Sequence, residues 1–535
     1  MTTYLAPLDE IRFTLKEIAR IGDVVDAPTL DVILEQAGRF GTDILEPLNR
    51  VGDHEGARLD RDAVHTPPGF KEAYAQFVEG GWNGLPFPEQ FGGQALPWSV
   101  NAAISEIWNS ANMTFQLCPL LTQAAIEALL HHGTAAQQDI YLRPLVQGTW
   151  TGAMCLTEPQ AGSDVGAIRT RAERHDDHYR LYGEKIYITF GDHDMAENIV
   201  LMVLARLPEA PAGTKGISLF IVPKYLPENS GSLGPRNDVR CTAIEHKLGI
   251  HGSPTCVMTF GERDGAVGYL VGEEHGGMRC MFTMMNNARI AVGIEGLGIA
   301  ERAFQAARAY TDDRIQGRVD GRPAVIAEHP DVARMVKTIE AQVAAMRALA
   351  YVACAAQDEG QADRVALLTP IVKAWCTDRA CEVTSLAIQV LGGLGYIEEG
   401  GVAQYYRDAR ILPIYEGTNG IQAIDLAGRK LNMLDGALPW ALFDELRPEI
   451  VDAELRRALT TLEETTRVLQ SHDASARESV AGAYLDLFGG VLGSLYLARG
   501  AAADPDRLAL SKFYNQRLLP KALAEAQVIS AVLSP

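Results

Sequence analysis

The sequence predicts a multidomain α+β protein in which a helical segment, a β-rich segment, a helical bundle and a helical extension follow one another. Three observations lead to this prediction. The chain has 535 residues, more than one compact domain usually holds. Apolar residues recur at three- and four-residue spacing on both sides of a central segment. The central segment itself is rich in short runs of Val, Ile, Tyr and Thr, which are typical of strands.

The first predicted domain, residues 1–148, is helical from Leu8 to about Leu145, with breaks at Pro and Gly clusters such as LPFPEQFGGQALP. The second, residues 149–273, is a β domain of about 125 residues, a size that suits a barrel or a sandwich. Its expected strands lie in TWTGAMCLTE, YRLYGEKIYITF, NIVLMVLARL, GISLFIVPKYL, TCVMTF and GYLVGE.

Helical spacing returns after Gly276 and Gly277 and predicts a bundle of long helices over residues 274–435, including a run over 366–391. Residues 436–535 form a further helical extension. Three amphipathic helices are expected there, at roughly 451–469, 478–498 and 505–532.

The charge balance excludes two classes of partner. Lys and Arg number 48 and Asp and Glu number 68, so the formal net charge is −20. A surface this acidic repels nucleic acid and anionic membranes, because affinity for phosphate groups depends on Lys and Arg. A local basic pocket for one small anionic ligand stays open.

The eight cysteines are scattered through apolar surroundings and include no CxxC pair. This pattern favours buried, reduced thiols in a cytoplasmic protein over a disulfide framework or a zinc site, so no metal is expected. The N-terminus lacks a positively charged start followed by an apolar stretch, so no signal peptide is expected. Seven polar residues interrupt the longest uncharged window, 107–126, which argues against a membrane span.

The first candidate site is CLTEPQAGSDVGA, residues 155–167, which ends a strand with Thr-Glu-Pro and continues through Ala-Gly-Ser-Asp. Gly and Ser permit close backbone approach and offer N–H and hydroxyl donors, which suits a flat polar ring or a phosphate. A plain turn after a strand fits the same residues.

The second candidate is QVLGGLGYIEEGGVAQYYRDAR, residues 389–410, in which Gly392, Gly393 and Gly395 close a helix. Such a loop can cradle a pyrophosphate, or it can simply cap the helix. No predicted strand precedes it, so the dinucleotide fingerprint of nicotinamide enzymes is absent.

The third candidate is ILPIYEGTNGIQ, residues 411–422, where Glu416 lies between an apolar approach and a Gly-Thr-Asn-Gly turn. Desolvation by the neighbouring Ile, Leu and Tyr side chains would raise the pKa of Glu416 and suit it to act as a general base toward a weakly acidic carbon. An acidic residue that favours the dipole of the following helix is the alternative.

In this order and spacing the three segments resemble the acyl-CoA dehydrogenase family, over about residues 30–435. The resemblance implies an N-terminal helical domain, a middle β-barrel, a C-terminal four-helix bundle, an FAD cofactor and a homodimer, with a tetramer as the alternative. Within the family the chain is most similar to the longer bacterial branch that contains 3-methylmercaptopropionyl-CoA dehydrogenases. That similarity rests on YLAPLDEIRFTL, KIYITFGDHDMAENIV, HKLGIHGSPTC and the tail beyond Asp435.

The resemblance also assigns the FAD contacts position by position. The strand-end segment would line the flavin, Tyr187 would replace the family's usual Trp over the ring, and the Gly-rich helix end would hold the adenine half of a neighbouring subunit's FAD. The assigned positions are Met154, Leu156, Thr157, Gly162, Ser163, Tyr187, Thr189, Arg314, Gln389, Gly392, Gly393, Thr418 and Asn419.

Two positions depart from the family pattern. The family's Arg-Lys-Thr-Phe-Gly appears here as DRIQG, residues 313–317, which puts the expected pyrophosphate arginine at Arg314. Gly420 stands where the family usually has Gln. One adenine-side contact is therefore expected to be missing or supplied differently.

By the same resemblance, Glu416 would remove an α-proton of an acyl-CoA while the β-hydrogen leaves as hydride to the flavin, giving a trans-2-enoyl-CoA. A short- or medium-chain substrate is expected, with 3-methylthiopropionyl-CoA as the specific candidate. Electron-transfer flavoprotein would then accept the electrons.

Four positions would contact the substrate. For Arg289 a structural helix salt bridge is the alternative. Some relatives carry their base on the same helix, but residues 286–288 are Asn-Asn-Ala here and offer no carboxylate. The four substrate positions are Ser163, Arg289, Tyr415 and Gly417.

Other functions stay open on the sequence alone. An acyl-CoA oxidase that uses O₂ would share these motifs. A non-catalytic, DNA-associated relative would need a basic binding surface, and residues 436–535 hold no run of Lys and Arg. A purely structural helical protein is the third alternative.

Overall fold

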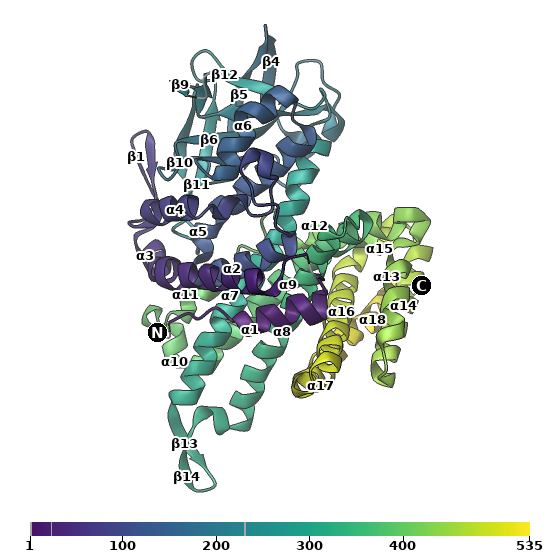
Figure 1. Ribbon diagram of the computed structural model, residues 1–535. Helices are drawn as coiled ribbons and strands as arrows, with labels where there is room; N and C mark the ends of the chain where they lie inside the picture. Colours follow the sequence, from purple (N-terminus) through teal and green to yellow (C-terminus); the bar gives the residue numbers. More distant parts are fainter. Residues whose placement is uncertain (1–2, 23, 229–231, 535) are drawn as a thin grey trace. The chain divides into compact units, whose positions relative to one another are not determined.

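The computed structural model describes residues 3–22, 24–228 and 232–534. Its contacts divide the chain into two compact units. The helical unit comprises Met1–Thr42, Pro97–Ala111 and Arg289–Pro535, and the sheet unit comprises Asp43–Leu96 and Asn112–Ala288. Two long helices, α5 (Trp98–His132) and α7 (Gly277–Asp313), contribute residues to both units (Figure 1).

The sheet unit contains an eight-stranded sheet in the order β10-β11-β5-β12-β7-β6-β3, with β4 paired to both β5 and β6. Neighbours along the order are antiparallel except for β3 and β6, which run parallel with Met154 opposite Met202. The strands are β3 (Trp150–Cys155), β4 (Arg171–His175), β5 (His178–Thr189), β6 (Asn198–Arg206), β7 (Ile217–Pro223), β10 (Val239–Ile244), β11 (Thr255–Phe260) and β12 (Ala266–Val271).

The predicted strands are confirmed in β3, β5, β6, β7, β11 and β12, because their apolar residues form the core of this sheet. Three strands of this segment, β4, β9 (Leu233–Arg236) and β10, escaped prediction. In β4 only Ala172 is buried, and its other residues are charged and exposed, so no apolar alternation marks it. A small separate sheet pairs β8 (Tyr225–Pro227) with β9.

The rest of the sheet unit is helical apart from one hairpin. Besides its parts of α5 and α7, its α-helices are α3 (Glu46–Glu55), α4 (Phe70–Glu79) and α6 (Ala135–Gln147). Helix α6 begins with a capping box between Thr134 and Gln137 and ends at Gly148, whose φ is 80°. The hairpin β1 (Arg58–Asp60) and β2 (Ala63–His65) corrects the prediction of an all-helical N-terminal segment.

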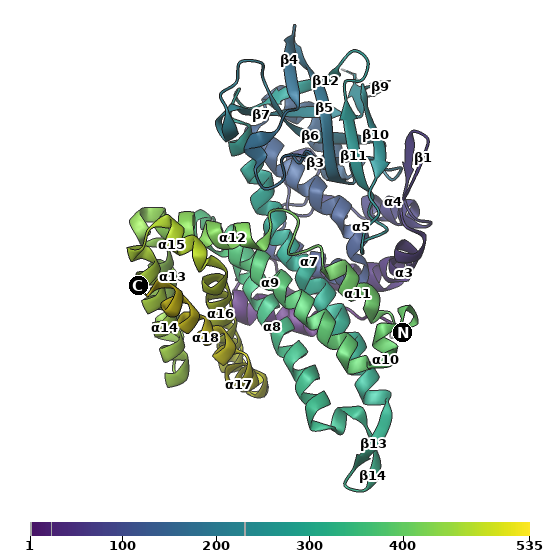
Figure 2. The ribbon, with the colours of Figure 1, turned by 180° about the vertical axis from the view of Figure 1, so that it is seen from behind.

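The helical unit is built around α7, α8 (Pro330–Asp358) and α9 (Ala362–Leu391), which are seen side by side in Figure 2. A Cβ at Gly293 would meet Val372 at 2.5 Å, so glycine lets α7 lie directly against α9. Shorter helices complete it: α1 (Leu8–Phe13), α2 (Ala27–Arg39), α10 (Gly393–Tyr396), α11 (Val402–Ala409) and α12 (Asn419–Asp425). A hairpin of β13 (Ile315–Val319) and β14 (Arg322–Val325) joins α7 to α8.

A buried ion network also ties this unit together. Arg347 Nη2 of α8 lies 2.7 Å from Glu106 Oε1 of α5 and 2.7 Å from Glu301 Oε2 of α7. All three side chains are at most 5% exposed, and Tyr351 donates a further hydrogen bond to Glu106. Each buried carboxylate therefore has a charged partner, as burial of a charge requires.

The extension packs on the same unit through α16 (Ala481–Ala503), which contacts α8 and α9. A Cβ at Gly489 would meet the Trp375 ring at 2.4 Å, so a small residue is required there. The other helices are α13 (Leu438–Leu446), α14 (Ala453–Ser471), α15 (Ala474–Ser479), α17 (Leu508–Arg517) and α18 (Leu519–Leu533).

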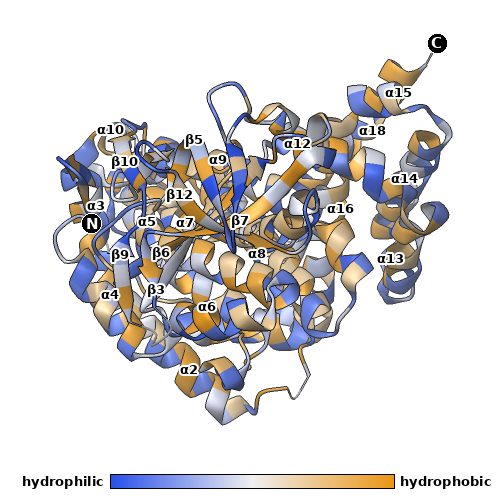
Figure 3. Ribbon diagram, turned by 90° about the horizontal axis from the view of Figure 1, so that it is seen from above, coloured by the Kyte–Doolittle hydropathy of each residue, from blue (hydrophilic) through white to orange (hydrophobic). Residues whose placement is uncertain are grey.

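Two of the three predicted tail helices are confirmed as α14 and α16, and α14 alternates hydrophilic and hydrophobic residues along its length (Figure 3). The third was predicted as one helix over 505–532 and is two, α17 and α18. Pro520 in the first turn of α18 has no N–H that could donate a hydrogen bond to the preceding helix. The helix is therefore interrupted at Leu518.

Three helices of the described chain, α5, α8 and α16, are long and apolar enough to cross a membrane by length and composition. The window 107–126 lies in α5, so its polar residues are weaker evidence against a span than the sequence suggested. In the fold, 89%, 89% and 78% of their most apolar windows are buried. Core packing thus accounts for their apolar character.

Candidate active site

In the sheet unit, the ends of β3 and β5 bring five of the predicted flavin residues to one place. Met154 lies on β3, and Leu156 and Thr157 follow its end. The N–H of Ile186 in β5 donates to the carbonyl of Thr157 over 2.9 Å, which sets Thr157 beside the segment of Tyr187 and Thr189.

Tyr187 has an unusual backbone and an unusual exposure. Its φ is 60°, a left-handed conformation that bulky residues rarely adopt, and its side chain is 60% exposed. A strained backbone that presents an aromatic ring to the surface is typical of a ligand platform. Thr157 and Thr189 are partly buried next to it.

A buried ion pair fixes this place. Lys185 Nζ lies 2.8 Å from Glu158 Oε1, and the two side chains are 0% and 4% exposed. Burial alone would raise the pKa of Glu158, but Lys185 and hydrogen bonds from Thr170 and the Arg169 N–H outweigh it and lower the pKa to about 2. Lys185 also donates to the Leu156 carbonyl, so the pair holds the segment that carries Thr157.

Gly162 and Ser163 lie farther along the same loop and are exposed. A Cβ at Gly162 would meet nothing within 4 Å, so the fold of this chain does not require glycine there. The open space leaves room for a ligand to approach the backbone.

In the helical unit, Glu416 lies in the loop between α11 and α12. Its φ is 55°, a left-handed conformation, and its side chain is partly buried. Burial raises the pKa of Glu416, while Arg289 and Lys373 pull it down. A carboxylate tuned in this way is suited to general base catalysis, as the sequence predicts.

Asn419 anchors this loop to α9. Its Nδ2 donates to the Ala374 carbonyl, Thr377 Oγ1 and Asp378 Oδ1 over 3.1, 2.9 and 2.8 Å. Lys373 Nζ donates to Asn419 Oδ1 over 2.8 Å. The Asn419 side chain, which was predicted to contact the cofactor, thus forms hydrogen bonds within the chain and fixes the Glu416 loop to α9.

The neighbouring Thr418 caps α12, since its Oγ1 accepts from the Ile421 N–H over 3.3 Å. Gly417 has a φ of 85°, and a Cβ there would meet Gln422 Nε2 at 2.8 Å, so this turn requires glycine. Both residues thus shape the turn that follows Glu416.

Arg289 lies on α7, is 4% exposed, and donates from Nε to the Glu416 carbonyl over 3.4 Å. Burial lowers its pKa, and the nearby Asp425 and Glu416 carboxylates partly restore it. The structure therefore brings Arg289, Tyr415, Glu416 and Gly417 together.

The same place contains two ionisable residues that the sequence did not single out. Glu295 of α7 is fully buried and accepts a hydrogen bond from the Tyr415 hydroxyl. Burial raises the pKa of Glu295 to about 8, and it lowers the pKa of Lys373 to about 7. Perturbed ionisable groups gathered around a partly buried carboxylate are characteristic of active sites.

The remaining predicted cofactor residues of this unit lie elsewhere. Gln389, Gly392 and Gly393 are exposed at the end of α9, and Gln389 is eleven residues beyond Asp378, about 16 Å along the helix. Arg314 is exposed where α7 passes into β13.

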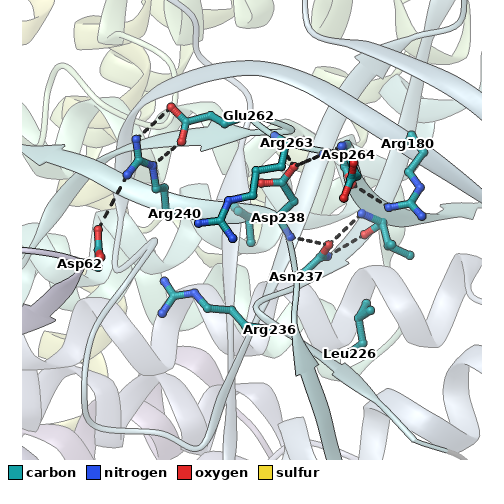
Figure 4. A pocket seen from close by; sticks show the side chains of 13 residues that line it. Asp62, Arg180, Leu226, Arg236, Asn237, Asp238, Arg240, Glu262, Arg263 and Asp264 are labelled. Carbon is teal, nitrogen blue, oxygen red and sulfur yellow. Dashed lines mark hydrogen bonds and ion pairs between the residues drawn. The ribbon is translucent and has the colours of Figure 1, made fainter.

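A separate pocket of about 400 Å³ lies on the sheet unit (Figure 4). Arg240 there bridges Asp62, at 3.8 Å, and Glu262. Asp238 Oδ2 accepts the backbone N–H groups of Arg263, Asp264 and Gly265 over 2.8, 3.0 and 3.1 Å. The lining of this pocket includes none of the predicted site residues.

Comparison with known proteins identifies the family. Three family models match consecutive parts of the chain, namely the acyl-CoA dehydrogenase N-terminal domain over residues 33–149, its middle domain over 153–262 and its C-terminal domain over 275–431. The 3-methylmercaptopropionyl-CoA dehydrogenase of Ruegeria pomeroyi is 49% identical over 83% of this chain and 79% of its own.

Solved structures agree. The butyryl-CoA dehydrogenase of Megasphaera elsdenii superposes with a TM-score of 0.64 at 30% identity, over 75% of this chain and 98% of that chain. A chain from the structure titled for the electron transferring flavoprotein of Acidaminococcus fermentans gives 0.65 at 30% identity, over 75% and 97%. With its helical N- and C-terminal domains and its sheet-containing middle domain, the protein belongs to the acyl-CoA dehydrogenase family of oxidoreductases.

Proposed function

We propose that the protein is an FAD-dependent acyl-CoA dehydrogenase with Glu416 as its catalytic base. The observation that carries this proposal is the state of Glu416: a partly buried carboxylate on a left-handed residue, with its pKa raised by burial and with Arg289 and Lys373 nearby. A base for the α-carbon of a thioester needs a pKa above that of an ordinary carboxylate.

In the proposed reaction, Glu416 removes an α-proton from the acyl thioester and becomes protonated. The enolate-like charge collects on the thioester oxygen, where the backbone N–H of Glu416 stabilises it by hydrogen bonding. Arg289 holds the Glu416 carbonyl and so orients the residue. The α-carbon and β-carbon become doubly bonded, which gives a trans-2-enoyl-CoA.

When bound, FAD, the cofactor of the family, would supply the acceptor, at its N5 atom, for the β-hydrogen that leaves as hydride. The residues present suit this group. Tyr187 offers an exposed aromatic face, Thr157 and Thr189 offer hydroxyls beside it, and Gly162 leaves open space. We assign the flavin to this place and the adenine half to Gln389, Gly392 and Gly393 of a partner subunit, with Arg314 toward the pyrophosphate.

We expect the purified protein to contain one FAD per chain and to be a homodimer, because the proposed adenine contacts at the end of α9 belong to a partner. The tail that begins after Asp435 packs on the helical unit and would block a second interface. Absorbance at the flavin maximum and light scattering measure the two quantities. A monomer that retains FAD would contradict this proposal.

We propose 3-methylthiopropionyl-CoA as the preferred substrate, supported by the 49% identity to the Ruegeria pomeroyi enzyme. Anaerobic bleaching of the flavin by a panel of acyl-CoAs tests it, with kcat/KM compared from butyryl- to palmitoyl-CoA. We expect 3-methylthiopropionyl-CoA or a C4 to C8 substrate to rank first. Palmitoyl-CoA as the best substrate, with inert short chains, would refute the assignment.

Electron-transfer flavoprotein is our proposed electron acceptor, and the same experiment distinguishes it from O₂. After bleaching under anaerobic conditions, the enzyme is mixed either with electron-transfer flavoprotein or with air. Rapid reoxidation by the flavoprotein and slow reoxidation by air are expected. The reverse order would make the protein an acyl-CoA oxidase.

We further propose four domains, over residues 1–148, 149–273, 274–435 and 436–535, with a barrel in the second and a four-helix bundle in the third. The pairing of β4 with both β5 and β6 supports a closed sheet. A cytoplasmic location is supported by the eight free cysteines.

A further inference from the structure

Glu295 is a buried carboxyl group with too few partners for an anion. Its side chain is 0% exposed. Tyr415 donates one hydrogen bond to Oε2, and no described residue of the chain makes a hydrogen bond to Oε1. An ionised carboxylate in such a place would carry the full cost of desolvation with one neutral donor to offset it, whereas a carboxylic acid would not.

The charges around Glu295 act in opposite directions, since the Glu416 carboxylate raises its pKa and Lys373 lowers it, and burial decides for the neutral acid. Three ionisable groups face it, Tyr415 and Glu416 from the loop and Lys373 from α9. Arg289 lowers the pKa of Glu416, and Arg289 is absent from the groups that act on Glu295. Two like carboxyl groups in one site do not both ionise readily, so the one beside the arginine retains the charge.

Glu295 also lies where it controls the base. Tyr415 is the residue directly before Glu416, and its hydroxyl reaches across 120 positions of sequence to α7. Arg289, on the same helix, holds the Glu416 carbonyl. Helix α7 therefore contacts the chain on both sides of the Cα of Glu416, a residue with a left-handed backbone.

On the basis of the proposed function, we infer that Glu295 is a positioning residue that acts as a neutral carboxylic acid: by holding the Tyr415 hydroxyl it fixes Glu416 against the substrate α-carbon. It neither donates nor accepts the substrate proton. Glu416 stays ionised and ready to accept that proton because its neighbour is uncharged.

Glu295→Gln and Glu295→Leu separate this role from a merely structural one. Gln is neutral, has the same length and still accepts from Tyr415, so flavin reduction by acyl-CoA should stay within about threefold of wild type at pH 7. Leu fills the space without the hydrogen bond, and reduction should slow by about tenfold to a hundredfold through misplacement of the base, with FAD content unchanged. Tyr415→Phe should reproduce the Leu variant.

Protonation is measured without turnover. The infrared difference spectrum between wild type and Glu295→Gln should contain the carbonyl stretch of a protonated carboxylic acid at pH 7, and this band should disappear near pH 8. Because the native state binds a proton that the unfolded state has lost between pH 4.5 and 8, wild type should also lose thermal stability relative to Glu295→Gln over that range.

Three results would overturn the inference: a Gln variant as slow as the Leu variant, a Leu variant as fast as wild type, or no carboxylic acid band at pH 7. The proposed function fails in a different way. If no acyl-CoA bleaches the flavin while the infrared band is present, the dehydrogenase assignment is wrong and the neutral state of Glu295 still holds.

Discussion

Glu416→Gln enzyme should retain its FAD and yet be reduced by acyl-CoA about 10²–10⁴ times more slowly than wild type. Gln preserves the size of the side chain and its hydrogen-bonding capacity but has no basic oxygen to accept the α-proton. Since Gln is uncharged, it also removes the Glu416 carboxylate from the surroundings of Arg289 and Lys373. Stopped-flow flavin bleaching measures the rate, and absorbance measures the FAD content.

Glu399→Gln is the matched control, because Glu399 is an exposed carboxylate of the same unit. It should change neither quantity. A structural Glu416 would show the opposite pattern, with lower thermal stability or FAD occupancy and near-normal turnover in the remaining holoenzyme. Wild-type bleaching by the Glu416→Gln enzyme would move the catalytic assignment to another residue.

Local patterns in the sequence were enough to predict the main elements and the loop of Glu416. Strands such as β6 and β7 consist mainly of apolar residues, and helices such as α9 keep their spacing over several turns. The apolar approach to Glu416 and the turn after it also mark that residue as unusual. These features depend on residues that are neighbours in the sequence, so local sequence patterns are sufficient to predict them.

Contacts between residues that are far apart in the sequence could not be predicted from local patterns. Lys185 and Glu158 are 27 positions apart, and a charged residue in a strand normally indicates a face toward solvent. Glu295 lies 120 positions from Tyr415 and occupies the apolar face of α7. In both cases only the folded chain shows that the charge is buried and which group accounts for it.

The interruption between α17 and α18 at Leu518 is a different case, because the sequence contains a signal for it. Pro520 stands inside the segment predicted as one helix, and a proline in the first turn of a helix is a start signal. The hairpin of β1 and β2 gave a weaker signal, since its strands have three residues each and only Val64 is buried. Short exposed strands have no periodicity that a sequence pattern can detect.

Lys185→Met should destabilise the sheet unit by about 3–5 kcal/mol, because it leaves the buried Glu158 carboxylate without its counterion. The segment with Thr157 should then move, since Lys185 also holds the Leu156 carbonyl. FAD occupancy should fall together with stability. Equilibrium urea denaturation and the flavin content of the purified protein measure the two effects.

The pH dependence identifies the charge as the cause. With its pKa lowered from 4.5 to about 2, Glu158 stabilises wild type above pH 4.5 and loses this contribution as the pH falls toward 2. The loss of stability in Lys185→Met should therefore be largest above pH 5 and shrink below it.

Arg171→Met, which removes an exposed ion pair with Glu173 in β4, should cost less than about 1 kcal/mol. Adding Glu158→Gln to Lys185→Met should restore part of the loss, because no charge then stays buried alone. A deficit that is equal at pH 4 and pH 7 and unaffected by Glu158→Gln would show that Lys185 contributes through packing of its methylenes and not through its ion pair.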